Sequence, residues 1–460
     1  MTDARLADLA DRLPHLRLLT EPADLEHYGR DWTRRWTPKP LAVALPGEIA
    51  EVQAIVRWAN EHGVAVVPSG GRTGLSGGAV AANGELVLSL ERMNRVLDFD
   101  AVDRTLTVQS GMTLHAVHEA AKERGLIYPV DFAARGSCSI GGNIATNAGG
   151  IRVIRYGNTR EWIAGLTVVA GNGELLQLNR GLIKNSSGYD LRHLMIGSEG
   201  TLGIVVEATL RLTDPPPPSQ VMLLALPSMD ALMEVFALFR ARLPLQAFEF
   251  LTDVALKHVL AHGAQRAIDG DHPYYVVTEF DADEAAQDAA FAAFEHGMEQ
   301  GWISDGVIAQ SEAQAAALWR LREGITESLA PHRPYKNDIS LRISALPAFL
   351  HEIQTLLGDA YPHFDVVWFG HIGDGNLHIN VLRPADVSDA DFIAQCEHVT
   401  KLLAETLQRH GGSISAEHGI GLVKRAYLGS TRSAGEIALM RGVRQVFDPK
   451  GLLNPGKLFD

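Results

Sequence analysis

The chain has 460 residues, which is long enough for two or three domains with sizeable cores. Hydrophobic residues make up 46% of it and charged residues 21%, which is typical of a folded protein and excludes long disorder. The formal net charge of −14 argues against nucleic acid as a partner, because phosphate binding needs clustered basic surface.

The sequence also bears on the compartment. Two cysteines, Cys138 and Cys396, give no disulfide framework and fit a reducing environment. No apolar run approaches the roughly 20 residues of a membrane helix. Residues 1–13 have neither the apolar core of a signal peptide nor the acid-poor composition of a transit peptide. We expect a cytoplasmic protein, with peripheral docking on a membrane left open.

The first part of the chain predicts a short helix at 6–13 and then a β-α-β unit. Its parts are a strand at 41–45, a helix at 48–62 with Gly63 as C-cap, and a strand at 64–67. A glycine-rich loop, residues 68–78, follows the second strand. Backbone N–H groups in such a loop can converge on a phosphate, although a hairpin without a ligand is the alternative. The loop is neither a Walker A motif nor a GxGxxG fingerprint, and its position separates the unit from a dinucleotide-binding domain.

Two further runs of small residues follow. After strands at 86–90 and 105–109 and a helix at 114–124, residues 136–150 carry small side chains at nearly every position. This favours backbone packed against a large flat group, with a helix–helix contact as the alternative. The third run, residues 197–203, leads into a strand at 204–212.

Residues 215–218 are four consecutive prolines, which form a rigid, extended spacer and mark the best domain boundary in the chain. Beyond it, strands alternate with helices, which predicts an α/β sheet domain. We expect strands at 221–226, 247–251, 274–280, 339–343, 366–369 and 377–381. We expect one helix that starts at residue 229 and another that ends at residue 261. Further helices are expected at 284–299, 312–329, 346–357 and 390–410, and a turn-rich tail at 447–457.

Histidines on both sides of a tight glycine turn form the first candidate site. If the flanks of the segment 370–380 pair as a hairpin, His371 and His378 lie on one face. With Glu417 from the segment 415–421, they make a three-ligand set for Zn²⁺, Mn²⁺ or Fe²⁺ that leaves a position open. Each histidine alone could equally be a hydrogen-bonded structural residue. Asp374 is a weaker ligand candidate, because a turn aspartate usually caps its own backbone.

A second candidate site is cationic. Arg322 and Thr326 are four residues apart on a predicted helix and so share a face, and Lys336 follows. Because arginine grips carboxylates with two hydrogen bonds, these residues suit a dicarboxylate substrate. An ordinary solvated helix face is the alternative.

Taken together, the motifs resemble the FAD-linked oxidoreductases of the vanillyl-alcohol oxidase / p-cresol methylhydroxylase type. The motifs PSGGRTGLSGG, GSCSIGGNIATNAGG, GYDLRHLMIGSEGTLGIV, GHIGDGNLHIN and AEHGIG occur in family order and span nearly the whole chain. The resemblance implies an α+β fold: a two-part FAD-binding domain (1–213), an α/β substrate or cap domain with an antiparallel sheet (214–410), and a C-terminal segment (411–460) that returns to the FAD domain.

The resemblance also assigns residues to roles. It implies that the first loop and the second and third runs hold FAD, through Pro68, Ser69, Gly70, Gly71, Arg72, Thr73, Gly74, Leu75, Gly77, Gly78, Pro129, Gly136, Ser137, Cys138, Ile140, Gly141, Gly142, Asn143, Ala145, Thr146, Gly149, Gly150, Glu199, Gly200 and Ile204, with Asn454 from the tail. It places His371, His378 and Glu417 on metal-ligand positions. It places Arg322, Thr326, Lys336, Asn380 and His418 on substrate positions, with His418 as the catalytic base. Asn337 departs from the aromatic residue of many relatives, which affects the expected pocket shape.

The implied activity is oxidation of a D-2-hydroxy acid, above all D-2-hydroxyglutarate, with D-malate, D-lactate or glycolate as alternatives. FAD is expected to be non-covalent, because the first loop contains no histidine. A divalent metal, most simply Zn²⁺ and otherwise Mn²⁺, is implied, as is an electron acceptor such as an electron-transfer flavoprotein, a quinone or a cytochrome. The sequence leaves undecided whether the protein forms a homodimer. The alternatives of other classes are a non-haem iron oxygenase and a flavin-binding electron-transfer subunit.

Overall fold

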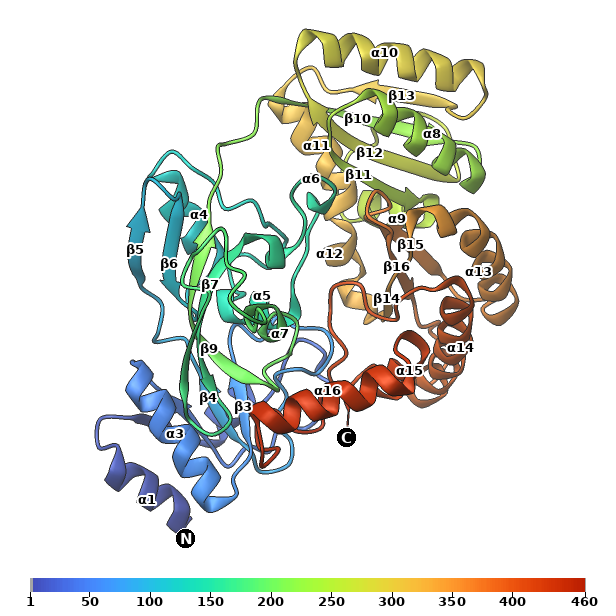
Figure 1. Cartoon of the computed structure of the whole chain (residues 1–460). Coiled ribbons are helices and arrows are strands. Elements are labelled where there is room, and N and C mark those ends of the chain that lie inside the picture. Colours follow the sequence, from blue (N-terminus) through green and yellow to red (C-terminus); the bar gives the residue numbers. More distant parts are fainter. Residues whose placement is uncertain (1–2, 460) are drawn as a thin grey trace. The chain divides into compact units, whose positions relative to one another are not determined.

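The computed structural model describes residues 3–459, and the chain divides into two compact units. Unit 1 takes the described residues up to Gly150, then Gly157–Pro215, and then Glu417 to the end of the described part. Unit 2 takes Ile151–Tyr156 and Pro216–Ala416. Figure 1 labels the elements of both units. Within the described residues, no helix combines the length and apolar character needed to span a bilayer.

Unit 1 contains two sheets and their covering helices. Its helices are α1 (Ala4–Arg12), α2 (Pro22–Tyr28), α3 (Ile49–His62), α4 (Leu114–Lys122), α5 (Ile140–Thr146), α7 (Arg192–Met195), α15 (Leu428–Thr431) and α16 (Ala434–Phe447), with 3-10 turns η1 (Thr159–Trp162) and η4 (Arg425–Tyr427). Its strands are β1 (Arg17–Leu19), β2 (Ala42–Leu45), β3 (Val66–Ser69), β4 (Leu86–Ser89), β5 (Val96–Asp100), β6 (Thr105–Gln109), β7 (Ile163–Ala170), β8 (Leu175–Leu178) and β9 (Gly203–Arg211).

The first sheet of unit 1 has the strand order β1-β2-β4-β3, and β2 and β3 both run parallel to β4. Helix α3 connects β2 to β3 and ends at Gly63, whose φ of 63° gives the left-handed C-cap. Trp58 and Ile55 of α3 are buried against the sheet together with Leu9 of α1. The predicted β-α-β unit is confirmed, and its glycine loop begins where β3 ends.

The second sheet of unit 1 is antiparallel, with the order β5-β6-β9-β7-β8. Its core contains Val117 of α4, Ile140 and Ile144 of α5, and apolar residues of β6, β7 and β9. Helix α5 lies inside the second small-residue run, where no helix was predicted. Its Ile140 and Ile144 are one turn apart, and this spacing lets a glycine-rich helix bury one face.

The C-terminal tail is part of unit 1. Leu453 forms an isolated parallel bridge with Val66 of β3. The ammonium of Lys457 is buried and donates to the carbonyl oxygen of Val80 at 2.8 Å. The expected return of the C-terminal segment to the first domain is therefore confirmed.

Unit 2 is built on one large sheet. Its helices are α6 (Val153–Tyr156), α8 (Met229–Arg242), α9 (Asp253–Ala261), α10 (Glu284–Glu299), α11 (Glu312–Glu323), α12 (Ile325–Leu329), α13 (Leu346–Ala360) and α14 (Asp389–His410), with 3-10 turns η2 (Ala330–His332) and η3 (Ile343–Ala345). Its strands are β10 (Ser219–Leu226), β11 (Leu245–Thr252), β12 (Tyr274–Asp281), β13 (Asp305–Ile308), β14 (Tyr335–Ser340), β15 (Val366–Gly370) and β16 (Asn376–Val381).

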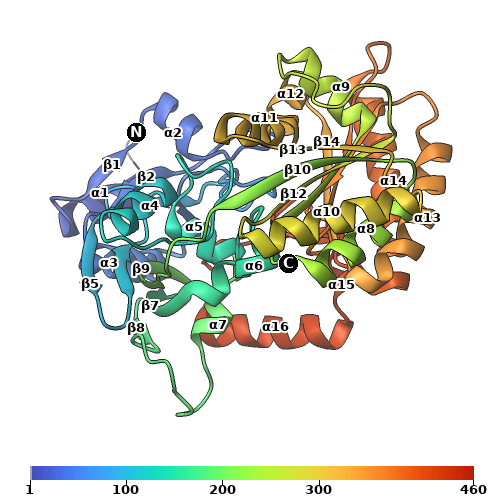
Figure 2. The same ribbon diagram turned by 90° about the horizontal axis from the view of Figure 1, so that it is seen from above.

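The seven strands follow the order β13-β10-β12-β11-β15-β16-β14, and each pair is antiparallel, as expected for this domain. Figure 2 shows α8 and α10 on one side of the sheet and α11 and α12 on the other. Phe236 of α8 packs on Phe248 of β11 with ring centroids 5.0 Å apart. On the opposite face, Leu251 of β11 is buried with Leu321 of α11 and Ile325 of α12.

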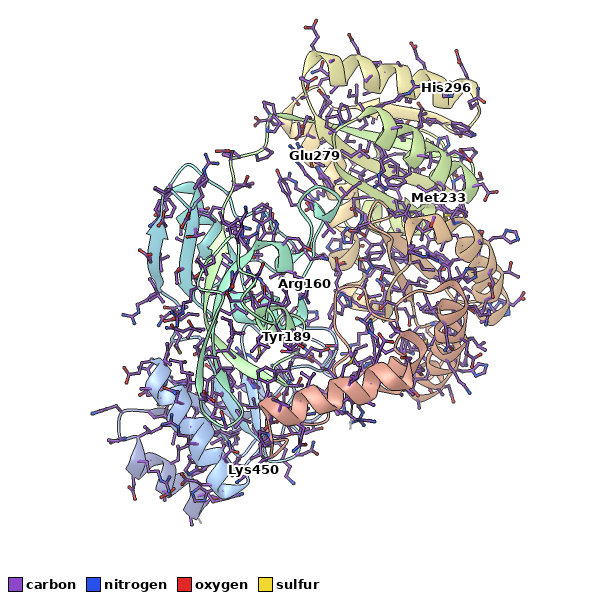
Figure 3. The ribbon with its side chains drawn as sticks, in the orientation of Figure 1. Arg160, Tyr189, Met233, Glu279, His296 and Lys450 are labelled. Carbon is purple, nitrogen blue, oxygen red and sulfur yellow. The ribbon has the colours of Figure 1, made fainter. Side chains whose placement is uncertain are left out.

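A short segment of the chain, Ile151–Tyr156, joins unit 2 although the residues on both sides of it belong to unit 1. Arg152 pairs with the buried Glu279 of β12, labelled in Figure 3, at 3.2 Å. Arg155 pairs with Asp281 at the end of the same strand. Two ion pairs therefore fasten this segment to β12.

Two predicted elements of unit 2 are wrong in their bounds. The helix expected over 312–329 is broken at Gly324, where a Cβ would lie 2.7 Å from the Arg320 carbonyl oxygen and 3.3 Å from Val259 of α9. The chain therefore turns where it approaches α9. The strand expected at 339–343 is β14 at Tyr335–Ser340, and Ile343–Ala345 form a 3-10 turn. Lys336, Asn337 and Asp338 are polar, so the sequence of this segment lacks the apolar pattern that predicts a strand.

Candidate active site

The first two glycine-rich runs pack directly on one another in unit 1. A Cβ on Gly70 would lie 2.0 Å from Oγ of Ser139, and one on Gly71 would lie 1.9 Å from the carbonyl oxygen of Ser137. Both separations are far below any real Cβ contact, so these two glycines are required by the approach of the second run. By contrast, a Cβ on Gly74 would meet nothing within 4 Å. The loop is thus closed at its base and open further along.

The walls of this loop fit a polar ligand. Oγ of Ser69, at the end of β3, and Oγ of Ser110 are both buried without a hydrogen-bond partner among the described residues. Buried hydroxyls normally find a partner, so two unsatisfied ones indicate a missing acceptor or donor. Gly141 lies beside Ser110, since a Cβ there would be 3.0 Å from its Cβ. These residues fit the pyrophosphate part of FAD.

Arg72 does not extend into open space. Its guanidinium lies over the ring of Tyr28 at 4.5 Å and donates from Nη1 to the carbonyl oxygen of Gly70 at 3.0 Å. Nη2 lies 3.0 Å from Nε2 of His27. Arg72 therefore stabilises the loop itself, with its backbone in the left-handed region at a φ of 57°.

Glu199 of the third run holds another loop. Its buried carboxylate accepts the N–H groups of Ile420 at 2.7 Å and Gly421 at 2.9 Å. Burial raises the pKa of this carboxyl group to about 7, against the opposing effect of the two N–H donors. Glu199 thereby positions the segment that directly follows Glu417 and His418. The cofactor contact expected for Glu199 stays a prediction.

Asn454 links the first and third runs. Its Nδ2 donates to the carbonyl oxygens of Gly78 at 2.9 Å and Glu199 at 2.7 Å, and its backbone N–H donates to Val66. A Cβ on Gly200 would lie 3.2 Å from Pro68. The three runs that the sequence assigned to FAD therefore lie together in unit 1.

Several other residues expected around FAD have structural partners. Thr146 Oγ1 donates to the carbonyl oxygen of Gly142, and a Cβ on Gly150 would lie 2.1 Å from the carbonyl oxygen of Asp131. Ile204 is buried in the core between β9 and α3. The thiol of Cys138 is buried, which raises its pKa to about 11, so it is protonated at neutral pH. These residues shape unit 1 whether or not they also contact the cofactor.

The two histidines lie in unit 2 as expected. β15 and β16 pair as an antiparallel hairpin with Phe369 opposite His378, and His371 follows β15. The imidazole rings of His371 and His378 have centroids 5.3 Å apart. Glu417 follows Ala416, the last residue of unit 2, and offers a carboxylate oxygen within 4.8 Å of a ring nitrogen of each histidine. Two imidazoles and one carboxylate are a donor set that suits Zn²⁺.

Each histidine has a carboxylate behind it that sequence reasoning missed. Nδ1 of His371 lies 2.9 Å from Glu249 of β11, and Nδ1 of His378 lies 3.7 Å from Asp338 of β14. Nδ2 of Asn376 donates to the same Asp338 carboxylate at 2.9 Å. Metal-binding histidines commonly have a hydrogen-bonded carboxylate partner, which fixes the ring and its tautomer. The contact of His371 is within hydrogen-bond distance, whereas that of His378 is at ion-pair distance only. Glu249 and Asp338 come from strands distant in sequence from the histidines, and a single carboxylate in a strand does not by itself indicate such a contact.

Three of the expected substrate residues, Arg322, Lys336 and Asn380, lie on this same face of the sheet. β14 and β16 pair with Lys336 opposite Asn380 and with Asp338 opposite His378. Because strand residues two apart share a face, Lys336, Asn380 and His378 face the same side. Arg322 of α11 is 5% exposed, and its guanidinium lies 4.9 Å from the ring of Phe369 on that side.

Two expectations about this pocket are wrong. Arg322 and Thr326 do not share one helix face, because the break at Gly324 separates them and leaves Arg322 buried and Thr326 exposed. Asn337 does not shape the pocket on the Lys336 side. It lies opposite Ile379, on the other face of β14, and its Oδ1 accepts a hydrogen bond from Thr400 of α14.

Lys336 carries an uncompensated charge. Burial lowers the pKa of its ammonium, and no carboxylate within residues 3–459 forms an ion pair with it. Arg322, by comparison, has its Nη2 2.8 Å from Oε2 of Glu249. A half-buried ammonium without a counter-ion favours an anionic ligand.

Comparison with known proteins agrees with this arrangement. Residues 215–458 match the family described as "FAD linked oxidases, C-terminal domain", and residues 40–179 match the "FAD binding domain". The chain is 77% identical to D-2-hydroxyglutarate dehydrogenase of Xanthomonas citri pv. viticola over 100% of its own length and 98% of the relative's. It is 52% identical to the protein of the same name from Stutzerimonas stutzeri, over 100% of both.

A solved structure gives the fold independently. The chain superposes on p-cresol methylhydroxylase with substrate bound with a TM-score of 0.75 and 14% identity, over 100% of this chain and 98% of that one. At this identity the likeness shows the fold alone. The expected α+β fold with an FAD-binding domain and an antiparallel cap domain is confirmed.

Proposed function

This chain belongs to the family of FAD-linked oxidases, and we propose that it is a D-2-hydroxyglutarate dehydrogenase that also accepts D-malate or related D-2-hydroxy acids. The observation that carries the substrate class is the uncompensated ammonium of Lys336 on the sheet face that also holds Arg322, Asn380 and the two histidines. Relatives of 77% and 52% identity bear this activity in their names.

The cationic residues account for recognition of a diacid. A guanidinium or ammonium hydrogen-bonded to a carboxylate contributes about 1.5–3 kcal/mol. Glu249 already compensates the charge of Arg322, whereas no carboxylate in the described part of the chain forms an ion pair with Lys336. We therefore assign Lys336 as the group that adds most to the binding of the second carboxylate of the substrate. Arg322 is a second hydrogen-bond donor to that carboxylate, and Asn380 lies directly opposite Lys336.

Loss of the substrate proton is assigned to His418. A neutral imidazole is suited to this task near pH 7, since its unperturbed pKa lies close to that pH. Glu199 fixes the backbone of Ile420 and Gly421, two and three residues further along, so the base is carried on a restrained loop. FAD, when bound, supplies the acceptor for the two electrons and the hydrogen of the C2 carbon.

We also propose a divalent metal, most simply Zn²⁺, held by His371, His378 and Glu417. When bound, such an ion supplies Lewis-acid polarisation of a hydroxyl or carboxylate oxygen. The support is the donor set itself, with ligand atoms within 4.8 Å of one another, and the carboxylates behind both imidazoles. Mn²⁺ is the alternative ion for the same donors.

Anaerobic reduction of the bound flavin tests the proposed function without an external electron acceptor. We expect D-2-hydroxyglutarate to bleach the flavin absorbance within single turnovers, D-malate to do so more slowly, and the L-enantiomers not at all. Bleaching by no 2-hydroxy acid would favour an electron-transfer subunit instead. Equal apparent second-order rate constants of flavin reduction by D-lactate and D-2-hydroxyglutarate would contradict the assignment of a diacid.

Replacing Lys336 by methionine is expected to lower kcat/KM for D-2-hydroxyglutarate about 10–150-fold, the equivalent of one charge-assisted hydrogen bond. The effect on D-lactate should be several-fold at most, because a monoacid has no second carboxylate to lose. Steady-state kinetics with both acids measure the difference. Lys401 of α14, a solvent-facing residue in a helix of unit 2, offers the matched control K401M. Equal losses for both acids would remove Lys336 from diacid recognition.

A further inference from the structure

We propose that Glu249 is a positioning residue that sets both the substrate-binding arginine and the metal-binding histidine. This inference rests on the proposed function, because it takes Arg322 as a carboxylate-binding residue and His371 as a metal ligand. No motif singled out Glu249, which lies in the buried strand β11 among mostly apolar residues. All three residues belong to unit 2.

One carboxylate serves both groups. Glu249 lies on β11 and is 1% exposed. Its two oxygens are each 2.9 Å from Nδ1 of His371, and Oε2 is 2.8 Å from Nη2 of Arg322. Within the described residues, these are the two cationic or imidazole groups that ion-pair with this carboxylate.

The contact with His371 determines which nitrogen can bind a metal. A carboxylate accepts a hydrogen bond from Nδ1 only when that nitrogen carries the proton. The lone pair of the neutral ring then resides on Nε2, which leaves Nε2 as the ligand atom. A negatively charged partner also makes the imidazole a stronger donor to a metal. Loss of the charge of Glu249 should therefore weaken metal binding.

The contact with Arg322 determines where its guanidinium lies. Nε and Nη2 of Arg322 are buried and have no hydrogen bond of good geometry to any residue in 3–459. Charge attraction to Glu249 and stacking on Phe369 therefore hold the guanidinium. The ring of Phe369 also lies 5.0 Å from that of His378. Glu249 and Phe369 thus fix the arginine from two sides while its remaining N–H groups stay available.

A buried ion pair alone would be a structural feature with no bearing on function, so the test needs a matched buried pair elsewhere. Glu279 of β12 provides one: it is buried in the same sheet and pairs with Arg152 at 3.2 Å. Glu279→Gln and Glu249→Gln should both lower the thermal stability. Only Glu249→Gln should change metal affinity.

The experiment titrates Zn²⁺ into metal-free, FAD-loaded protein against a chelating indicator, with no substrate present. We expect Glu249→Gln to bind Zn²⁺ about 10–100-fold more weakly than the wild type, as loss of a carboxylate behind a ligand histidine typically does. Glu249→Asp, which keeps the charge on a shorter side chain, should fall between the two. Glu279→Gln should match the wild type. The KM for D-2-hydroxyglutarate should rise in Glu249→Gln more than kcat falls.

The outcomes separate this inference from the proposed function. If wild type and His371→Ala bind Zn²⁺ equally weakly, the proposed metal site is wrong. If the wild type binds Zn²⁺ tightly and Glu249→Gln binds it as tightly, only the role of Glu249 is overturned. Should Glu249→Gln fail to fold, equal Zn²⁺ affinity in Glu249→Asp and the wild type, together with an unchanged KM, overturns the role as well.

Discussion

Replacing His418 by alanine is expected to slow anaerobic reduction of the bound flavin by D-2-hydroxyglutarate about 10²–10⁴-fold, the range found when a general base is lost. The physical reason is that the C2 hydrogen leaves with its electron pair only as the hydroxyl proton is taken away. Without an imidazole at this position, water would have to accept that proton. Stopped-flow absorbance of the flavin measures the step directly.

A base and a purely structural histidine would behave differently as pH changes. If His418 takes the proton, the flavin reduction rate of the wild type depends on pH, and His418→Ala lacks that dependence. The exposed His363 gives the matched control H363A, which should reduce flavin as fast as the wild type. A near-normal rate in His418→Ala with an unchanged pH profile would reject the assignment. FAD content must be equal in all three proteins.

Local patterns predicted much of the fold. The helix ending at Gly63 and helix α10 at Glu284–Glu299 follow from apolar spacing and end signals, because each is decided by residues within the element. The break at Gly324 depended on contact with α9, a separate element, and so carried no clear local signal. β14 was misplaced because the face that it turns to the candidate site holds Lys336 and Asp338, whose polar side chains interrupt the apolar pattern that predicts a strand.

The residues of the candidate site also fall into those that local sequence could predict and those that it could not. His371 and His378 could be predicted because they flank one tight turn, and hairpin pairing brings such neighbours to one face. Their carboxylate partners could not be predicted, since Glu249 comes from β11 and Asp338 from β14. The glycines of the first loop were attributed to a ligand, whereas Gly70 and Gly71 are required by contact with Ser137 and Ser139. Such contacts between distant segments exist only in the folded chain.

Removing the metal should have an effect as large as removing the base. Replacing His378 by alanine takes away one of three donors, and Lewis-acid stabilisation is worth several kcal/mol, so we expect the flavin reduction rate to fall at least about 10²-fold. Zn²⁺ content, measured by elemental analysis, should fall from about one per chain to near zero. The bound FAD should be retained, because the glycine runs that fit it lie in unit 1 and His378 lies in unit 2.

Chelation should cause the same loss of activity reversibly. It therefore distinguishes the effect of the ion from the effect of the histidine side chain. Wild type treated with a strong chelator should lose activity and regain it with Zn²⁺ or Mn²⁺, whereas His378→Ala should not respond to either ion. His351, exposed on α13, gives the matched control H351A, which should keep its metal and its rate. Because three protein donors would leave a coordination position open on a tetrahedral ion, a metal held by these residues would be accessible to substrate. Full activity in metal-free wild type would contradict the proposed metal. The two histidines would then have a structural role, and His418 would remove the proton without help from a metal.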